Sequence, residues 1–225
     1  MANTIPRETL LGFYRHGVFP MAGPDGLQLF SPDPRGILPI EGFHVPHGTR
    51  RAWKEMEWEL RVDTCFPEVM LACAEREETW IDETIFQSYV ALHQAGCAHS
   101  IEIWSGGRLA GGLYGVRIGA AFFGESMFHR VTNASKIALC CLVALLKNGG
   151  FQLLDTQWVT PHLVQFGAVE IPRPVYLRML AGAVSADADF QDATLSRYDL
   201  DSLFPPGTGA PGGLPRVGRL SREKM

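Results

Sequence analysis

Residues 121–158 read AFFGESMFHRVTNASKIALCCLVALLKNGGFQLLDTQW, and this stretch decides the fold because it predicts a strand, a helix and a second strand in succession. The aromatic-rich residues 121–128 predict the first strand. Apolar residues at helical spacing follow from Asn133, and two consecutive glycines end that helix before the second strand starts at Phe151. A crossover of this length favours parallel pairing of the two strands.

Three polar side chains lie near the carboxyl ends of these strands. Glu125 directly follows Gly124, and a glycine inside a strand often marks a bulge or a close backbone approach. Asp155 and Gln157 are two residues apart, so their side chains are expected on the same face of the strand. Ligands of such parallel units bind near the carboxyl ends of the strands, which makes Glu125, Asp155 and Gln157 candidate site residues. The spacing leaves open whether Asp155 is only a cap or an ion-pair partner.

The composition predicts an ordinary globular protein. The chain has 225 residues, 46% of them hydrophobic, which is enough for a substantial core in one domain or in one domain with a smaller lobe. The net charge of −4 argues against nonspecific coating of nucleic acid. An RNA contact is therefore expected only at a local basic patch, and Arg50, Arg51 and Lys54 form the densest such cluster before the C-terminal residues.

The cysteines and the apolar runs indicate a cytoplasmic protein without a membrane segment. The five cysteines are odd in number and include no Cys-x-x-Cys, which speaks against a disulfide framework or a zinc ribbon. The longest apolar run, residues 137–146, is far shorter than the ~20 residues of a membrane span. His44 and His47 have no third ligand at a telling distance, so no metal site is assigned.

The other segments predict a small N-terminal lobe, a catalytic domain and a tail. The expected bounds are 1–47 for the lobe, 48–182 for the domain and 183–225 for an irregular, basic tail rich in proline and glycine. In the proline-containing segment of residues 31–35, Asp33 and Arg35 are most simply interpreted as turn residues. The expected elements are helices at 7–20, 67–76, 82–94 and 160–166, a strand at 58–62, and a three-stranded antiparallel meander that runs from His99 into residues 121–128.

This order of elements is similar to that of the GNAT acyltransferase fold, an α/β (α+β) fold. The resemblance implies a mixed sheet in which two parallel strands splay apart, so that an acyl donor in the gap meets Glu125 on one strand and Asp155 with Gln157 on the other. GNAT enzymes that use coenzyme A carry an Arg/Gln-x-x-Gly-x-Gly/Ala loop at the start of the following helix. Residues 130–135, RVTNAS, lack both glycines, which makes a coenzyme A dependent N-acetyltransferase the weaker alternative.

Ordered sequence blocks along residues 11–180 resemble those of the leucyl/phenylalanyl-tRNA-protein transferase family of the bacterial N-degron pathway. The blocks are YRHGVFP (14–20), FSPDPRG (30–36), TWI (79–81), AHSIEIW (98–104), GGLYGV (111–116), FFGESMF (122–128), NASK (133–136), LLDTQW (153–158) and EIPR (170–173). The resemblance implies transfer of Leu or Phe, less readily Met, from its tRNA to the α-amino group of proteins that begin with Arg or Lys. It implies no metal and no organic cofactor, since the aminoacyl-tRNA is a substrate, and it implies no DNA or membrane partner.

The resemblance also implies roles for individual residues. Asp155 and Gln157 would be the catalytic pair, in which Asp155, directly or through Gln157, holds the incoming amine and helps to withdraw its proton. Glu125 would line the site of the aminoacyl-adenosine. The pocket of that group would involve Phe30, Trp80, Leu113, Phe122, Met127 and Asn133. For Trp80 the sequence pattern by itself favours a place in the core.

Three alternatives are open. Family members usually carry a tryptophan-rich run before SPDPR, and this chain has Leu29 and Phe30 there, which leaves the stacking of the terminal adenine and the preferred amino acid open. Leucyl transfer to acidic N-termini is an alternative within the family. A noncatalytic module that binds RNA or degrons is the alternative outside enzymes.

Overall fold

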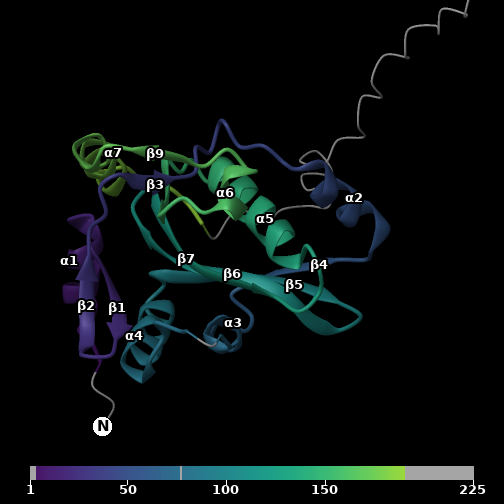
Figure 1. Ribbon diagram of the computed structural model, residues 1–225, viewed down its shortest axis with the longest axis horizontal. Coiled ribbons are helices and arrows are strands. Elements are labelled where there is room, and N and C mark those ends of the chain that lie inside the picture. Colours follow the sequence, from purple (N-terminus) through teal and green to yellow (C-terminus); the bar gives the residue numbers. More distant parts are fainter. Residues whose placement is uncertain (1–3, 77, 191–225) are drawn as a thin grey trace, which may run out of the picture.

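The computed structural model describes residues 4–76 and 78–190, which form a mixed α/β structure around a seven-stranded sheet (Figure 1). A separate two-stranded sheet pairs β1 (Phe19–Gly23) with β2 (Gly26–Phe30). The strands of the large sheet, in spatial order, are β4 (Glu59–Val62), β5 (Ala98–Ser105), β6 (Arg108–Ile118), β7 (Ala121–His129), β8 (Leu153–Gln157), β3 (Arg35–Ile37) and β9 (Val169–Ile171).

The strand, helix and strand predicted from residues 121–158 are confirmed as β7, α5 (Ala134–Asn148) and β8. β7 and β8 pair in parallel, with Ala121 opposite Leu153 and Phe123 opposite Asp155. The antiparallel meander is confirmed as β5, β6 and β7. The sheet is therefore mixed, and its parallel step is the one that α5 bridges.

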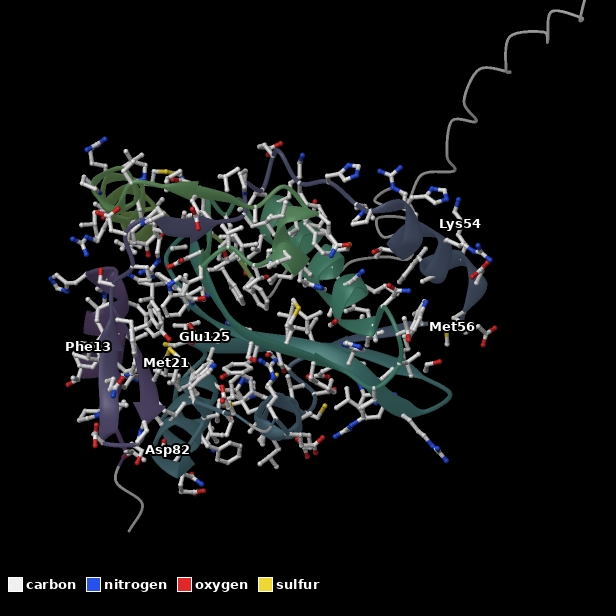
Figure 2. The ribbon with its side chains drawn as sticks, in the orientation of Figure 1. Phe13, Met21, Lys54, Met56, Asp82 and Glu125 are labelled. Carbon is white, nitrogen blue, oxygen red and sulfur yellow. The ribbon has the colours of Figure 1, made fainter. Side chains whose placement is uncertain are left out.

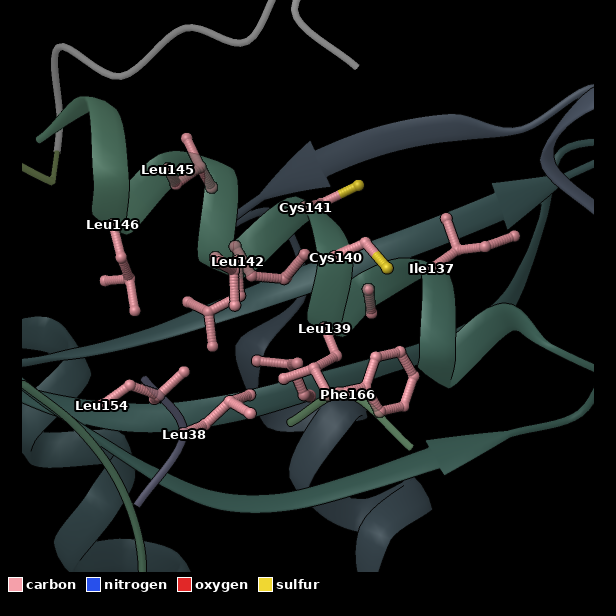
Figure 3. Packing of buried hydrophobic residues seen from close by; sticks show 14 of the residues in the cluster. Leu38, Ile137, Leu139, Cys140, Cys141, Leu142, Leu145, Leu146, Leu154 and Phe166 are labelled. Atoms are coloured by element: carbon pink, nitrogen blue, oxygen red, sulfur yellow. The ribbon is translucent and has the colours of Figure 1, made fainter. Parts of the chain in front are cut away.

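Helix α5 is buried on nearly all sides because it packs between the sheet and α2 (His47–Glu55). Its leucines meet Leu38 and Leu154 of the sheet layer, as Figure 3 shows. Asn133 is the N-cap residue but has a left-handed backbone with φ of 72°, and its side chain makes no capping hydrogen bond. The predicted helix start is correct.

The opposite face of the sheet carries α3 (Phe66–Ala74) and α4 (Glu83–Gln94), so α5 and this helix pair enclose the sheet from two sides (Figure 1). Two buried clusters result, one beneath α5 and one around Tyr89 and Phe123. The N-terminal segment packs onto the second cluster. It comprises α1 (Arg7–Arg15), β1 (Phe19–Gly23) and β2 (Gly26–Phe30).

Two expectations at the chain ends change. β3 belongs to the large sheet, so Arg35 is a strand residue and its prediction as a turn residue is wrong. After α6 (Pro161–Val164) and β9, helix α7 (Arg173–Ser185) extends past the expected domain end at residue 182. Most of the predicted tail, residues 191–225, lies outside the described residues. No helix within residues 4–76 and 78–190 combines the length and apolarity that a membrane span needs.

Candidate active site

The site begins where β7 and β8 part. In the described chain, their pairing covers three residue pairs and ends at Phe123 and Asp155. Beyond that point each strand carries an extra residue. On β7, Ser126 and Gly124 face consecutive residues of β6, which leaves Glu125 as the extra one, and this confirms the bulge predicted at Gly124. Such bulges bend a strand and redirect its side chains.

The bulge on β8 has the same consequence. Gln157 and Asp155 face consecutive residues of β3, Gly36 and Ile37, so that Thr156 is the extra residue. Gln157 then takes a left-handed backbone with φ of 57°. The period of two that places Asp155 and Gln157 on one face is therefore broken, and their side chains go to different surroundings.

A cavity of about 600 Å³ lies next to this divergence. Glu125 and Gln157 line it, together with Trp80, Leu113 and Met127 from the set expected for the aminoacyl-adenosine pocket. Trp80 is thus a cavity residue, which corrects the core position favoured by the pattern alone. Further apolar walls come from Leu139 and Leu142 of α5, Leu154 of β8 and Leu163 of α6.

Glu125 lies near the centre of the structure (Figure 2) and accepts hydrogen bonds from three side chains. Its Oε1 is 2.8 Å from the Tyr14 hydroxyl and 3.2 Å from Nε2 of Gln157, and its Oε2 is 3.4 Å from the Tyr89 hydroxyl. The Tyr14 and Tyr89 hydroxyls also lie within hydrogen-bonding distance of each other, and because each carries one proton, Tyr89 donates either to Tyr14 or to Glu125.

Burial raises the pKa of Glu125 to about 8, and the negative charge of Asp155 acts in the same direction. The hydrogen bonds from Tyr14 and Tyr89 and the positive charge of Arg35 oppose that rise. A carboxyl group with a pKa in this range exchanges a proton near neutral pH. Glu125 is therefore suited to proton transfer with a group in the cavity.

Asp155 is fully buried and does not line the cavity. Its carboxylate forms a bidentate ion pair with Arg35, in which Nε lies 2.9 Å from Oδ1 and Nη2 lies 2.6 Å from Oδ2. The Tyr176 hydroxyl donates to Oδ2 at 2.6 Å, and the backbone N–H of Gln157 donates to Oδ1 at 2.9 Å. Direct contact between Asp155 and a substrate amine is therefore wrong for this geometry, and of the pair only Gln157 faces the cavity.

Three residues expected in the pocket do not line this cavity. Phe122 is buried beneath α5, where its ring packs against those of Phe151 and Phe190. The ring centre of Phe30 lies 6.0 Å from those of Phe19 and Trp158. Those two residues line the cavity, so Phe30 packs against residues of the cavity wall without lining the cavity itself. Asn133 precedes α5, and it is the next-but-one residue, Ser135, that reaches the cavity.

The basic patch expected to bind tRNA lies on α2, at the end of the molecule away from Glu125 (Figure 2). Arg51 and Lys54 are exposed, and Arg51 pairs with Glu55 at 2.6 Å. Arg50 is half-buried. None of the three lines the cavity, so any role in tRNA binding must concern a part of the nucleic acid distant from the reacting end.

Sequence reasoning missed several residues that build the site. Tyr14 and Tyr89 are buried on α1 and α4, but neither helix pattern shows that their hydroxyls converge on Glu125. Arg35 was predicted only as a turn residue, within the FSPDPRG block. Tyr176 lies in a segment with no further signal. No group of three or more His, Cys, Asp or Glu side chains placed to hold a metal occurs among residues 4–76 and 78–190.

Comparison with known proteins identifies the family. The family model described as leucyl/phenylalanyl-tRNA protein transferase matches residues 37–181. A protein of that name from Akkermansia muciniphila is 50% identical over 190 residues, covering 82% of this chain and 98% of its own length. Its counterpart from Paramagnetospirillum magneticum is 51% identical over 197 residues, with 84% and 94% covered, and that from Phenylobacterium zucineum is 50% identical over 208 residues, with 89% and 91% covered.

Among solved structures, the chain is similar to L-PGS from Bacillus licheniformis with a TM-score of 0.38 and 11% identity over 68% of this chain and 50% of that one, which is too weak to support a conclusion. The sequence matches to the three relatives are much stronger, because they cover most of this chain and of each relative at about 50% identity. The chain belongs to the leucyl/phenylalanyl-tRNA protein transferase family, a family of aminoacyltransferases.

Proposed function

We propose that this protein transfers Leu or Phe, and Met less readily, from aminoacyl-tRNA to the α-amino group of proteins that begin with Arg or Lys, which marks them for degradation in the N-degron pathway. The observation that carries the proposal is the cavity at the parting of β7 and β8, which joins an apolar wall to the hydrogen-bonded pair Glu125 and Gln157. The relatives supply the reaction class through their name. A tRNA substrate would place the reaction in the cytoplasm.

The apolar wall supports the choice of donor. Leu113, Leu139, Leu142 and Leu154 offer aliphatic surface without a charged group. Leu, Phe and Met share an unbranched β-carbon and an apolar side chain, so a wall of this kind would accept all three. Val and Ile, which branch at the β-carbon, are expected to fit less well.

The chemistry requires mainly positioning, because an aminoacyl ester is already activated. Holding the amine and the ester together is worth about 7–11 kcal/mol of barrier. Gln157 donates through Nε2 to Glu125, which leaves its carbonyl oxygen to accept a hydrogen bond from the incoming amine. We propose no metal and no organic cofactor, since the ester supplies the driving force.

Glu125 takes the proton that the amine loses. As the amine nitrogen forms its bond to the ester carbonyl carbon, the bond from that carbon to the tRNA ribose oxygen breaks, and Glu125 passes the proton to that oxygen, which leaves as the ribose hydroxyl. A base with a pKa of about 8 is matched to an α-amino group, whose ordinary pKa is about 7.7–8.0. In this scheme Asp155 acts on Gln157 and does not touch substrate.

The proposal includes a GNAT-type arrangement of the sheet. It is supported by the order β4, α3, α4, β5, β6, β7, α5, β8 and by the divergence of β7 from β8. In this arrangement the gap between the two strands receives the esterified end of the tRNA. Phosphates further along the tRNA would contact the basic patch of Arg50, Arg51 and Lys54.

The charges at the cavity bear on the acceptor. Glu75 lines it, and an acidic group favours a cationic Arg or Lys terminus. Arg76 and Arg130 line it as well, and Arg130 pairs with Glu75 at 3.3 Å. These arginines are the observation that keeps acidic N-termini as the second candidate acceptor.

One experiment tests donor, acceptor and reaction together. The protein is incubated with Phe-tRNA or Leu-tRNA and with peptides that begin with Arg, Lys, Asp or Ala, and peptide masses are measured. A gain of one Leu or Phe residue on the Arg and Lys peptides is expected. A gain on the Asp peptide instead would show the acidic acceptor class.

Two controls separate the other classes. Acetyl-CoA binding in calorimetry with acetylation of the same peptides would identify a coenzyme A dependent N-acetyltransferase. Peptide or tRNA binding without any mass change would identify a noncatalytic binding module. Either result contradicts the proposed function.

A further inference from the structure

Arg35 is a fully buried charge whose guanidinium joins three parts of the chain. It donates to Asp155 on β8 through Nε and Nη2 and to the backbone oxygen of Gly17, after α1, through Nη1 at 2.8 Å. Its carbon Cζ lies 5.0 Å from the ring centre of Phe19 and 4.5 Å from that of Tyr176. Burying a charge is costly, and apolar residues of similar size often stabilise a fold as well as a buried ion pair does, so stability alone does not account for this arrangement.

The contacts of Arg35 lead to both groups that donate to Oε1 of Glu125. Through Asp155 they reach the backbone N–H of Gln157, whose left-handed backbone is unfavourable for a residue with a β-carbon and needs a fixed partner. Through Gly17 they reach the end of α1, whose residue Tyr14 donates to Glu125. One guanidinium therefore fixes the position of the amide and of the hydroxyl that meet at Oε1 of Glu125.

We infer that Arg35, assisted by Tyr176, is a positioning residue for the transfer reaction: it orients the Asp155 carboxylate so that Gln157 is held against Glu125, and it anchors Tyr14 from the other side. The inference rests on the proposed function for its kinetic consequence. It assigns Asp155 a role inside the protein, as the link between Arg35 and Gln157. Burial and the charge of Asp155 raise the pKa of Tyr176, so its hydroxyl stays protonated and keeps donating.

A purely structural role for the ion pair predicts different behaviour. If Arg35 and Asp155 only stabilised the fold, replacing both by apolar residues of similar size would restore stability and activity together, because neither charge would then be buried without a partner. If they position Gln157, the same double replacement would restore stability but leave transfer impaired.

The kinetic test uses Tyr176→Phe, Arg35→Lys and the double variant Arg35→Met with Asp155→Leu, with Arg61→Lys as control. Arg61 is a surface arginine of β4 paired with Glu59, so its variant should behave like the parent. Each of the three test variants is expected to lower kcat by about 10- to 100-fold, with KM for aminoacyl-tRNA changed less than about threefold. A double variant with the parent's Tm and a kcat within about threefold of the parent would overturn the inference.

A second measurement does not depend on activity. A crystal structure of the double variant is expected to show Gln157 out of the left-handed conformation and without its hydrogen bond to Glu125. Tyr176→Phe, which keeps both charges, serves if the double variant fails to fold, and the Gln157 backbone N–H should then be less well aligned with Oδ1 of Asp155. If Gln157 keeps its conformation and its contact with Glu125 in the variant that folds, the inference is overturned, even if the parent transfers no amino acid and the proposed function fails separately.

Discussion

The Glu125 carboxylate lies within hydrogen-bonding distance of two tyrosine hydroxyls and of the Gln157 amide, beside a largely apolar cavity. Desolvation by the surrounding side chains favours the protonated form and raises the pKa to about 8. The protonated form dominates below that pH and cannot accept a proton. The proposed role therefore makes a prediction about pH.

Single-turnover transfer to an Arg-initiated peptide is expected to fall steeply as the pH falls below about 7, because both the acceptor amine and Glu125 must have lost a proton. Log rate against pH should have a slope of about 2 for the parent and about 1 for Glu125→Gln, in which one titrating group is removed. The measurement is the rate between about pH 5.5 and 7 with precharged tRNA.

The matched control for this experiment is Glu83→Gln, an exposed glutamate at the start of α4, which should keep the parent's slope. A slope of about 2 retained by Glu125→Gln would remove Glu125 as the proton acceptor.

Leu139 lines the cavity from α5, where its side chain would affect the donor specificity. Leu139→Phe adds volume to that wall, so kcat/KM should fall about 10-fold or more for Phe-tRNA and less for Leu-tRNA, since misfit in an apolar pocket costs about 1–3 kcal/mol. Competition between the two charged tRNAs measures the ratio. Leu71→Phe on the exposed face of α3 is the control, and an unchanged ratio in Leu139→Phe would show that this wall does not hold the donor side chain.

At the scale of elements, the short strand β3 decides the shape of the site. It lies between β8 and β9, and its residue Gly36 approaches β8 so closely that a β-carbon would lie 2.6 Å from the backbone carbon of Trp158. Backbone atoms cannot move aside as a flexible side chain can. The glycine therefore permits the approach that places Arg35 beside Asp155.

Gly36→Ala is expected to push β3 away from β8, which should lower the unfolding free energy by about 1–3 kcal/mol, as overpacking of a tight contact does. For a chain of this size that corresponds to a drop in Tm of about 2–4 °C per kcal/mol. Transfer measured well below the Tm should fall as well, because the Asp155 contact to Gln157 is displaced.

Gly12→Ala is the matched control, since no atom lies within 4 Å of a β-carbon at that helical position and alanine favours a helix. Its Tm should equal or exceed that of the parent. Full transfer activity in Gly36→Ala would show that the close approach of β3 does not position the site.

At the scale of the whole molecule, the cavity and the basic patch of Arg50, Arg51 and Lys54 lie in different regions, with the patch on α2 (Figure 2). A long substrate such as tRNA would span that separation. Contacts to phosphates add affinity that depends on salt and carry little base information.

Replacing Arg50, Arg51 and Lys54 by Gln is expected to weaken tRNA binding and to reduce the slope of log affinity against log salt by about 2. The decrease in slope should be smaller than that expected for the loss of three full phosphate contacts, because Arg51 already pairs with Glu55. Replacing the exposed Arg7, Arg15 and Arg178 by Gln changes the net charge equally and should leave the slope unchanged. If the two triple variants lower the slope equally, the α2 patch has no specific part in binding.

Sequence reasoning reaches far where the signal is local. Periodicity within windows of about ten residues predicts the strand, helix and strand of residues 121–158 and the meander before them. The bulge at Gly124 follows from a glycine inside an aromatic strand. Asp155 shows the limit of this reasoning. Its spacing in the sequence was compatible with both catalysis and ion pairing, and the structure shows the ion pair.

The sequence by itself determined the element order, the parallel step across α5, and the candidates Glu125 and Gln157, because each depends on residues near one another in the chain. Only the tertiary structure decided that Asp155 turns inward to Arg35, 120 positions away, and that Tyr14 reaches Glu125 across 111 positions. It also decided that Phe122 belongs to the core and Trp80 to the cavity. Such contacts depend on how sheet, helices and bulges pack in space, and no local pattern of side chains encodes them.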